Sequence, residues 1–479
     1  MSQAAATTKA LPRVIGFWGA TGVMLGIIVG SGIFATPHTV ADVSTGLWPM
    51  LGLWALGGLI SLCGAFTYAE LATAMPQAGG VYVFLREGYG AAGRCVAFVF
   101  GWTYMLISKP FAAAAIALVF GEHLCPLLGL VHTTTNAKLL TSAALVLLTV
   151  VNVVGVRLGS SLAGVLTIFK LGALLAIILG ACLAPAAIEP PDMSHAVTIP
   201  LWKALVIGMT AVLWTYDGWS DVGALAGEIK DPKRLLPITY LFGTLLITGL
   251  YVAINAAYVR TLGFEGVRGA TNLAPAVAGV LLPAGAGIVV SLVVVVSTFG
   301  STHGSIMTGA RISYAQARDG LLFRFLGRVH PRFETPDTSL WIQLGLSLLA
   351  LWALDGFGAM AGGFVFTMWI FYGLAGAAIF TLRLRRPDLE RPFRCPLYPV
   401  VPALFVLAAA GMTVLSVMEN PKANLLWIGV LLAGVPVYFL WQRLGSIPPS
   451  PPQPPPQPPP PSASPSTLPA RTSGTSFGG

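Results

Sequence analysis

Charged side chains are scarce in this sequence of 479 residues. Asp, Glu, Lys and Arg together make up 9% of the chain, whereas a soluble globular protein carries about 25%. So few charges cannot cover the water-exposed surface of a folded chain of this length. This shortage excludes a soluble enzyme, and the hydrophobic share of 55% excludes an intrinsically disordered protein.

Cysteine is also sparse, and its five positions are scattered and odd in number. Their spacing fits neither a disulfide framework nor a metal site. The chain also shows no nucleophile–base pair and no glycine-rich phosphate loop. We therefore expect no enzyme activity, no cofactor and no nucleic-acid partner. The cysteines are Cys63, Cys95, Cys125, Cys182 and Cys395.

Long hydrophobic runs are what the sequence has in abundance, and the mean hydropathy is +0.79. A helix needs roughly 20 apolar residues to cross a bilayer. The pattern predicts an all-α polytopic membrane protein with twelve transmembrane helices, in which the 55 glycines allow close helix packing. The predicted spans are 14–37, 47–75, 96–121, 138–156, 161–184, 201–228, 236–259, 284–316, 338–355, 361–383, 397–418 and 423–443.

The basic residues predict how these spans are oriented. With the N-terminal segment 1–13 inside, 20 Lys and Arg residues fall on the inner side and 5 on the outer side. Cytoplasmic loops carry the excess of positive charge in membrane proteins. We expect both termini in the cytoplasm, and the net charge of +9 has the same explanation. The first segment lacks a cleavable-signal pattern, so the first span is expected to be retained.

The C-terminal segment 444–479 has a different composition. Thirteen of the 36 prolines lie between Pro448 and Pro469. Such a segment favours polyproline II and cannot form a packed core. We interpret it as a disordered cytoplasmic tail, and a docking peptide for a partner stays open as the alternative.

Two predicted spans are interrupted near the middle of the membrane. The stretch GIIVGSGIFATP (26–37) contains Gly30, Ser31 and Gly32, and consecutive small residues weaken a helix. The stretch AVLWTYDGWSDVGALAGE (211–228) contains Asp217 followed by Gly218. An ionisable residue at that depth is costly and indicates function. Taken singly, the first stretch also fits a helix-packing motif and the second a simple kink.

The two interruptions occupy equivalent places, because each lies in the first of five consecutive spans. Paired interruptions of this kind are typical of secondary transporters built from inverted repeats. The repeats would be 14–184 and 201–383, with 397–443 outside them. Free N–H groups at the breaks would bind an anion, and free carbonyl groups would bind an ammonium group. A zwitterionic α-amino acid suits such a site.

Several long motifs resemble those of the amino acid–polyamine–organocation superfamily, and in particular bacterial relatives of the L-type amino-acid transporters. The resemblance covers nearly the whole chain up to about residue 443. The motifs are GSGIFATP (30–37), YAELATAMPQAGGVYVFLREGYG (68–90), LISKPFAAAAIALVF (106–120), WTYDGWSDVGALAGEIKDPKRLLP (214–237), FGSTHGSIMTGARISYAQARDG (299–320) and LRLRRPDLERPFRCPLYP (382–399).

The resemblance implies a LeuT-like fold that transports amino acids by alternating access. It places the substrate carboxylate on the backbone of the first interruption and the substrate amino group on carbonyls of both interruptions. Trp214 would close over the substrate on the outer side, and Ser220 would face it. The implied substrate-binding residues are Ile28, Val29, Gly30, Ser31, Gly32, Trp214, Thr215, Asp217 and Ser220. Ordinary packing stays open for Trp214, and an uninvolved hydroxyl for Ser220.

The resemblance also implies how transport is coupled. Lys170 lies in the fifth span, where sodium-coupled relatives bind a sodium ion next to the first span. In the L-type branch a lysine stands in for that cation, so Lys170 implies sodium-independent transport and a link to the first interruption. Tyr251 is expected at the same place. The alternatives are a structural charge pair for Lys170 and a packed aromatic for Tyr251.

The sequence analysis thus predicts a sodium-independent L-amino-acid exchanger in the cell inner (plasma) membrane. Neutral substrates are favoured, and cationic ones stay open because of Asp217. One alternative is a proton-coupled symporter of amino acids or polyamines that uses Asp217, Asp221 and His303. Another is a transporter-like nutrient sensor. In the animal transporters a cysteine in the outer loop after the third span tethers a partner glycoprotein. Cys125 lies at the very end of the third span instead, so the resemblance implies no disulfide-linked partner subunit.

Overall fold

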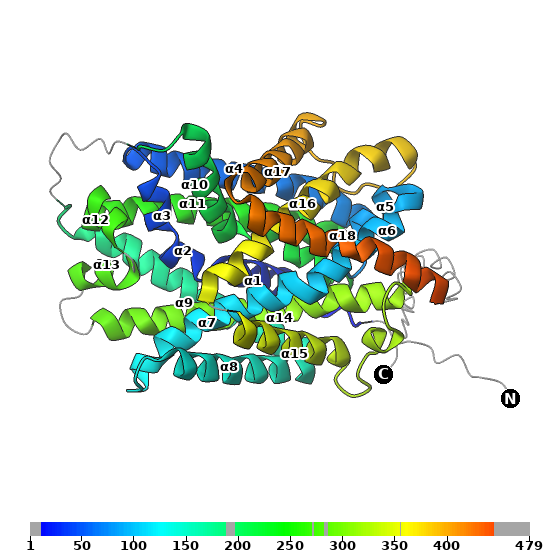
Figure 1. Ribbon diagram of the computed structural model, residues 1–479, viewed down its shortest axis with the longest axis horizontal. Coiled ribbons are helices and arrows are strands. Elements are labelled where there is room, and N and C mark those ends of the chain that lie inside the picture. The colour runs from blue at the N-terminus through cyan, green and yellow to red at the C-terminus, as the bar shows by residue number, and fades with distance from the viewer. Residues whose placement is uncertain (1–10, 188–196, 271–272, 282–285, 355, 445–479) are drawn as a thin grey trace, which may run out of the picture. The chain divides into compact units, whose positions relative to one another are not determined.

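The computed structural model describes residues 11–187, 197–270, 273–281, 286–354 and 356–444, which form one compact unit (Figure 1). Helices make up this unit, and the described residues contain no β-strand beyond a single bridge between Ile15 and Ile229. The all-helical class predicted from the sequence is confirmed. The predicted proline-rich tail lies outside the described residues.

The elements of the described unit have the following bounds: α1 Phe17–Ile28, α2 Gly32–Ala35, α3 Pro37–Asp42, α4 Leu47–Ala74, α5 Val81–Gly88, η1 Gly90–Ala92, α6 Gly93–Thr103, η2 Tyr104–Ser108, α7 Lys109–Leu127, α8 Thr134–Val154, α9 Val156–Leu183, α10 Leu201–Tyr216, η3 Trp219–Glu228, α11 Pro232–Leu262, α12 Phe264–Gly269, α13 Leu273–Leu281, α14 Ala286–Arg318, η4 Arg324–Gly327, α15 Asp337–Ala353, α16 Gly356–Arg385, α17 Val400–Glu419 and α18 Pro421–Leu444.

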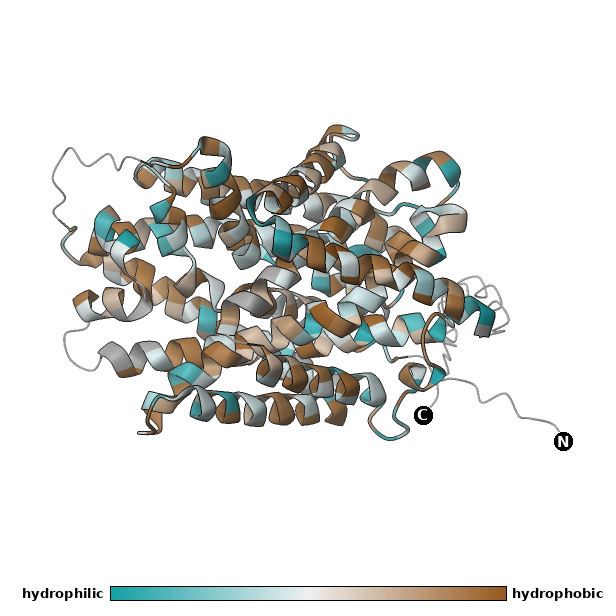
Figure 2. Cartoon of the chain, in the orientation of Figure 1, coloured by the Kyte–Doolittle hydropathy of each residue, from teal (hydrophilic) through white to brown (hydrophobic). Residues whose placement is uncertain are grey.

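Nine helical segments of the described unit are long and apolar enough to cross a membrane. Their lengths run from 19 to 38 residues, and brown, hydrophobic residues dominate the helices in Figure 2. The other three predicted spans correspond to α10, α14 and α15. The structure ends α10 after 16 residues, and α15 has only 17. The chain is therefore a multi-pass helical membrane protein.

The first span is interrupted where the small residues cluster. Helix α1 ends at Ile28, and α2 begins at Gly32 after a three-residue gap. Val29 has φ −76° and ψ 79°, which is outside the helical region. Most of α1 is buried, and it packs against α9, α11, α14 and η3. The interruption therefore lies inside the bundle, where other helices meet its free backbone groups.

The sixth predicted span is interrupted at Asp217 and Gly218. Helix α10 ends at Tyr216, Asp217 is extended, and η3 follows as a 3₁₀-helix. Gly218 has φ +112°, a conformation that residues with a Cβ rarely adopt. A Cβ atom there would lie 2.5 Å from Cγ2 of Ile27. Glycine thus permits both the turn and the close approach to α1.

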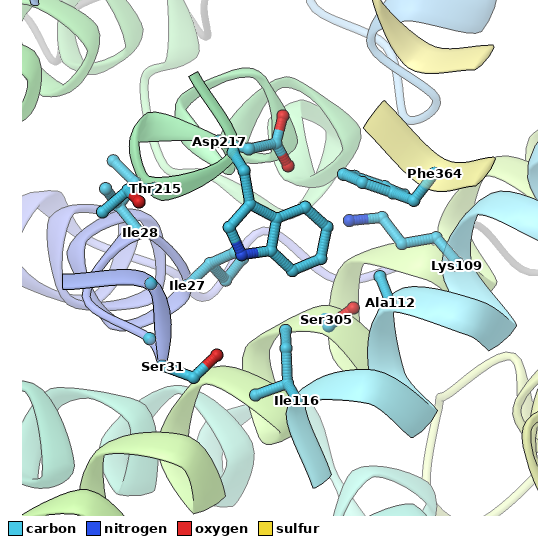
Figure 3. Close-up of a pocket in the computed structure, with 13 residues that line it drawn as sticks. Ile27, Ile28, Ser31, Lys109, Ala112, Ile116, Thr215, Asp217, Ser305 and Phe364 are labelled. Carbon is cyan, nitrogen blue, oxygen red and sulfur yellow. The ribbon is translucent and has the colours of Figure 1, made fainter. Parts of the chain in front are cut away.

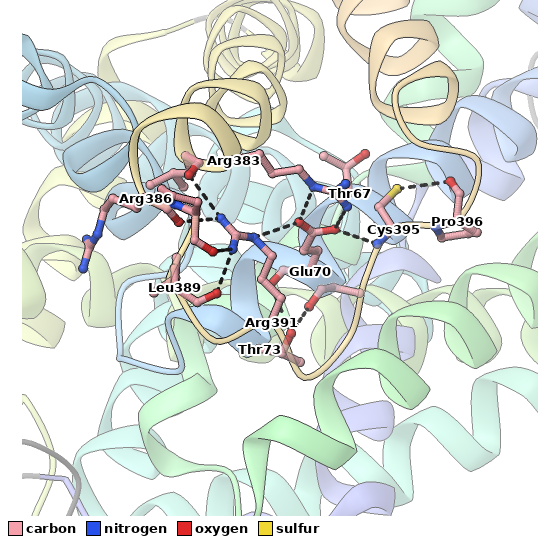
Figure 4. Close-up of polar contacts among 12 residues, drawn as sticks. Thr67, Glu70, Thr73, Arg383, Arg386, Leu389, Arg391, Cys395 and Pro396 are labelled. Atoms are coloured by element: carbon pink, nitrogen blue, oxygen red, sulfur yellow. Dashed lines mark hydrogen bonds and ion pairs between the residues drawn. The ribbon is translucent and has the colours of Figure 1, made fainter.

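A buried carboxylate holds the loop between α16 and α17 (Figure 4). Glu70 on α4 accepts two hydrogen bonds from the guanidinium group of Arg383, at 2.9 and 2.6 Å. The backbone N–H of Cys395 donates to the same carboxylate at 2.6 Å, and Arg391 lies 3.5 Å from it. A carboxylate shared in this way connects the loop to α4 and α16.

This arrangement predicts the reactivity of Cys395. Burial, together with the nearby charge of Glu70, raises the pKa of the Cys395 thiol to about 12. Since the thiolate is the reactive form, alkylation by N-ethylmaleimide at pH 7.5 should be slow. Replacing Glu70 by Ala should release the loop and accelerate the reaction by roughly 10-fold or more, measured by peptide mass spectrometry. Glu390→Ala, an exposed acid in the same loop, is the control, and equal rates in all three proteins would contradict this role of Glu70.

Candidate functional site

The two interruptions line a small cavity together with residues of three other helices (Figure 3). Its volume is about 30 Å³, which is room for water but not for an amino acid. The walls must therefore move apart before a substrate can occupy it. The lining residues are Ile27, Ile28, Gly30, Ser31, Gly32, Lys109, Ala112, Ile116, Trp214, Thr215, Asp217, Ser305 and Phe364.

Hydrogen-bond donors of this cavity lack partners. The hydroxyl groups of Ser31 and Ser305 are buried, and neither has a hydrogen-bond partner among the described residues. Within the same residues, the backbone N–H groups of Ser31 and Gly32 donate to no carbonyl. Because unpartnered buried donors are costly, such a cluster indicates a polar ligand. Such donors suit a carboxylate, which is the group that the family resemblance assigns to Ser31 and Gly32.

Tyr251 connects the two interruptions. Its hydroxyl lies 2.8 Å from the carbonyl oxygen of Ile28 and 3.3 Å from that of Thr215. The side chain of Thr215 lies 2.8 Å from the hydroxyl of Thr36, just beyond α2. Tyr251 is fully buried on α11. It therefore fixes the distance between the last turn of α1 and the end of α10.

Lys170 lies behind the first interruption and not in the cavity. Its ammonium group donates to the carbonyl oxygens of Gly26 and Val29, at 2.7 and 2.8 Å, and to the hydroxyl of Ser301, at 2.8 Å. Lys170 is 1% exposed. The carbonyl of Val29 also accepts from Ser297 and Ser301. Because these donors occupy it, and because Val29 does not line the cavity, it is not available to a substrate amino group.

Asp217 lines the cavity, whereas Ser220 does not. The hydroxyl of Tyr372 donates to Oδ1 of Asp217 at 2.9 Å, and Ser220 donates in turn to the Tyr372 oxygen at 3.0 Å. Ser220 therefore acts on the cavity only through Tyr372. Oδ2 of Asp217 has no side-chain hydrogen-bond partner among the described residues.

Trp214 separates the small cavity from a larger one. It lines both, and the second cavity has a volume of about 650 Å³. The indole packs edge-to-face against Phe357 and Phe364, with ring centroids 5.6 and 5.4 Å apart. The larger cavity extends past Thr39 to the α17–α18 connection at Asn420. Among the described residues, Trp214 is the one that lines both cavities, so its side chain lies between the two spaces.

The lining residues that were not selected from the sequence are Ile27 on α1, Lys109, Ala112 and Ile116 on α7, Ser305 on α14 and Phe364 on α16. Lys109 is the notable omission, because it forms a buried ion pair with Asp221. A lysine within an apolar span was itself a usable signal. The alanine, isoleucine and phenylalanine carry no such signal.

His303 does not line the cavity either. One ring nitrogen lies 3.0 Å from Asn152 and the other 2.8 Å from the carbonyl of Gly159. The neutral imidazole satisfies both contacts, because Nδ1 accepts from the Asn152 amide and the Nε2–H group donates to the Gly159 carbonyl. Among the described residues, no group of three His, Cys, Asp or Glu side chains is placed to hold a metal ion. Cys125 is buried with its thiol free.

Comparison with known proteins decides the family. The family model described as amino acid permease matches residues 15–439. The chain belongs to the amino acid permease family, within the amino acid–polyamine–organocation superfamily. This permease is 30% identical over 440 residues to the b(0,+)-type amino acid transporter 1 of Mus musculus, covering 91% of this chain and 89% of the relative.

Two further relatives also match this permease over most of its length. The serine/threonine exchanger SteT of Bacillus subtilis (strain 168) is 31% identical, covering 90% of this chain and 97% of its own. The human cystine/glutamate transporter is 30% identical, covering 88% and 83%. The family and its members are membrane transporters of amino acids, so this permease is a transporter and not an enzyme, as the sequence predicted.

Proposed function

We propose that this permease is a sodium-independent L-amino-acid exchanger that works by alternating access. The lining of the cavity supports this proposal. Among the described residues, Ser31, Gly32 and Ser305 contribute unpartnered hydrogen-bond donors on one side, and Asp217 lies on another. These groups match the carboxylate and the amino group of a zwitterion. In this structure the Ile28 carbonyl accepts from Tyr251 and from the backbone N–H of Gly30. As the walls part to admit a substrate, the carbonyl groups of Ile28 and Trp214 complete the amino-group site, and Trp214 closes it.

The proposed architecture has twelve spans in two inverted repeats. The interrupted α10–η3 pair, α14 and α15 supply the three spans beyond the nine that length and composition identify. In support, α4 packs along α11 and α7 along α14. These pairs join the second and third spans of one repeat to their counterparts in the other. The repeats are 14–184 and 201–383, helices α17 and α18 lie outside, and both termini face the cytoplasm of the inner (plasma) membrane.

Sodium independence is supported by the place of Lys170. A sodium ion between α1 and α9 would need carbonyl and hydroxyl oxygens, as hard cations do. The Lys170 ammonium already lies against three such oxygens, on Gly26, Val29 and Ser301. A fixed cation there supplies the positive charge without any dependence on external sodium.

Uptake into proteoliposomes tests the proposed function. Liposomes containing the purified protein and an internal amino acid should accumulate labelled L-alanine or L-leucine equally in sodium and in choline buffer. Empty-interior liposomes should take up far less. Strict sodium dependence would contradict the role of Lys170. Accumulation driven by a pH gradient without internal substrate would favour the proton-coupled alternative.

Asp217 predicts how cationic substrates are recognised. Among the described residues that line the cavity, Asp217 is the one acidic residue, so it should attract the side chain of arginine or lysine. In Asp217→Asn protein, arginine should compete for leucine uptake roughly 10-fold less well, while the competition by alanine changes less. Competition curves in both proteins measure this. A parallel loss for arginine and alanine would assign Asp217 to the substrate amino group instead.

Uptake by protein lacking 446–479 separates transport from sensing. A carrier should retain its uptake without the tail, because the described unit contains the whole cavity. Loss of a cellular response with uptake intact would favour the nutrient-sensor alternative.

A further inference from the structure

Lys109 and Asp221 form a buried ion pair at the edge of the cavity. Lys109 is the first residue of α7 and Asp221 lies on η3, and each side chain is 4% exposed. We propose that Asp221 neutralises Lys109 and thereby makes the cavity reject amino acids with acidic side chains, while neutral and cationic ones are admitted. This inference rests on the proposed amino-acid transport.

The position of Lys109 relative to the other lining residues supports this role. Figure 3 shows Lys109 and Phe364 across the cavity from Ile28 and Ser31. If the α-carboxylate and amino group lie at the first interruption, the substrate side chain extends toward Lys109. The apolar side chains of Ala112 and Ile116 lie on the same helix. Lys109 is therefore the cation that a substrate side chain would meet.

Asp221 holds this cation from outside the cavity. It does not line the cavity, and it also accepts a hydrogen bond from Thr308 at 3.2 Å. The Lys109 ammonium has the rings of Tyr104 and Phe364 as its other close neighbours, with centroids at 5.5 and 6.0 Å. Rings stabilise a buried cation only in part. Asp221 is thus the carboxylate that pairs directly with Lys109.

The resulting balance of charge disfavours an acidic side chain. A substrate carboxylate would find Lys109 already paired and would lie near Asp217, which has the same sign. Burying an unpaired carboxylate is costly, and a like charge raises the cost. A neutral side chain meets none of these costs. Removing the negative charge of Asp221 would free Lys109 to pair with a substrate carboxylate.

Glutamine and glutamate test the inference in the native protein, because they have nearly the same shape and differ by one charge. Labelled L-leucine uptake into proteoliposomes is measured against each competitor. Glutamine should inhibit at concentrations roughly 10-fold or more below those needed for glutamate. Equal inhibition by the two would overturn the inference. Failure to transport any amino acid would instead reject the proposed function, and the inference with it.

Variants test the cause of the discrimination. Asp221→Asn and the smaller Asp221→Ser should each improve inhibition by glutamate roughly 10-fold relative to glutamine. The double variant Lys109→Gln, Asp221→Asn should lose that gain, because no cation is left. Glu390→Gln makes the same change of net charge at an exposed pair with Lys233 and should keep the native ratio. An unchanged ratio in folded Asp221 variants overturns the inference, and if neither variant folds, the native competition still decides.

Discussion

Replacing Lys170 by Met is expected to reduce amino acid exchange by roughly 100-fold or more. The substitution removes three hydrogen bonds from a buried ammonium group, and each such charge-assisted bond contributes about 1.5–3 kcal/mol. It also removes the cation that holds α1 at Gly26 and Val29 against Ser301 of α14. A 100-fold decrease in rate corresponds to about 2.7 kcal/mol. Losing one such bond in the transition between conformational states is therefore enough to give the expected decrease in exchange.

Counterflow of labelled L-leucine in proteoliposomes measures the Lys170→Met effect. Lys203→Met is the matched control, because the Lys203 side chain is 38% exposed and pairs with Glu419 away from the interruptions. Both variants should elute as monodisperse protein, so that lost exchange is not lost folding. Exchange by Lys170→Met within twofold of native would show that the ammonium is only a packing element.

Replacing Trp214 by Ala is expected to raise the KM for L-leucine by roughly 10-fold or more, because tenfold corresponds to about 1.4 kcal/mol and truncating an aromatic binding hot spot costs at least that much. The indole fills the space between the cavities of about 30 and 650 Å³. Without it, the walls formed with Phe357 and Phe364 no longer meet. A substrate in the small cavity would then be exposed to the larger one.

Accessibility from outside gives a second readout for Trp214. A cysteine introduced at Ser305 should react with a membrane-impermeant methanethiosulfonate faster in Trp214→Ala protein than in protein with Trp214. The background should lack the exposed Cys182. Trp202→Ala, at an exposed position earlier on α10, is the control. If Trp214→Ala changes neither the KM nor the labelling rate, the indole does not separate the cavities.

Much of the fold could be predicted from short stretches of the sequence. Long apolar runs and motifs such as GSGIFATP predicted a helical membrane transporter, and the family match confirms it. The structure ends α1 and α10 within the stretches selected for their Gly, Ser and Asp residues. These signals are local, because small residues and a positive φ at Gly218 act on their own backbone.

Lys170 and Tyr251 contact the first interruption as expected, but other contacts between distant helices could not be predicted from the sequence. The pairing of Lys109 with Asp221 depends on how α7 meets η3, across 112 residues. The direction of the Val29 carbonyl depends on the dihedral angles of the interruption, which turn it toward Lys170. Ser220 faces Tyr372 because of the 3₁₀ geometry of η3. Side-chain type indicates that a polar group is present, and packing decides what it contacts.

An experimental structure of the protein with a bound L-amino acid tests the central claim most directly. The account predicts a single substrate between the two interruptions, with its carboxylate on the N–H groups of Ser31 and Gly32 and its amino group near the carbonyl of Ile28. Trp214 should cover it. A substrate bound only in the cavity of about 650 Å³, with the small cavity still closed, would contradict the account.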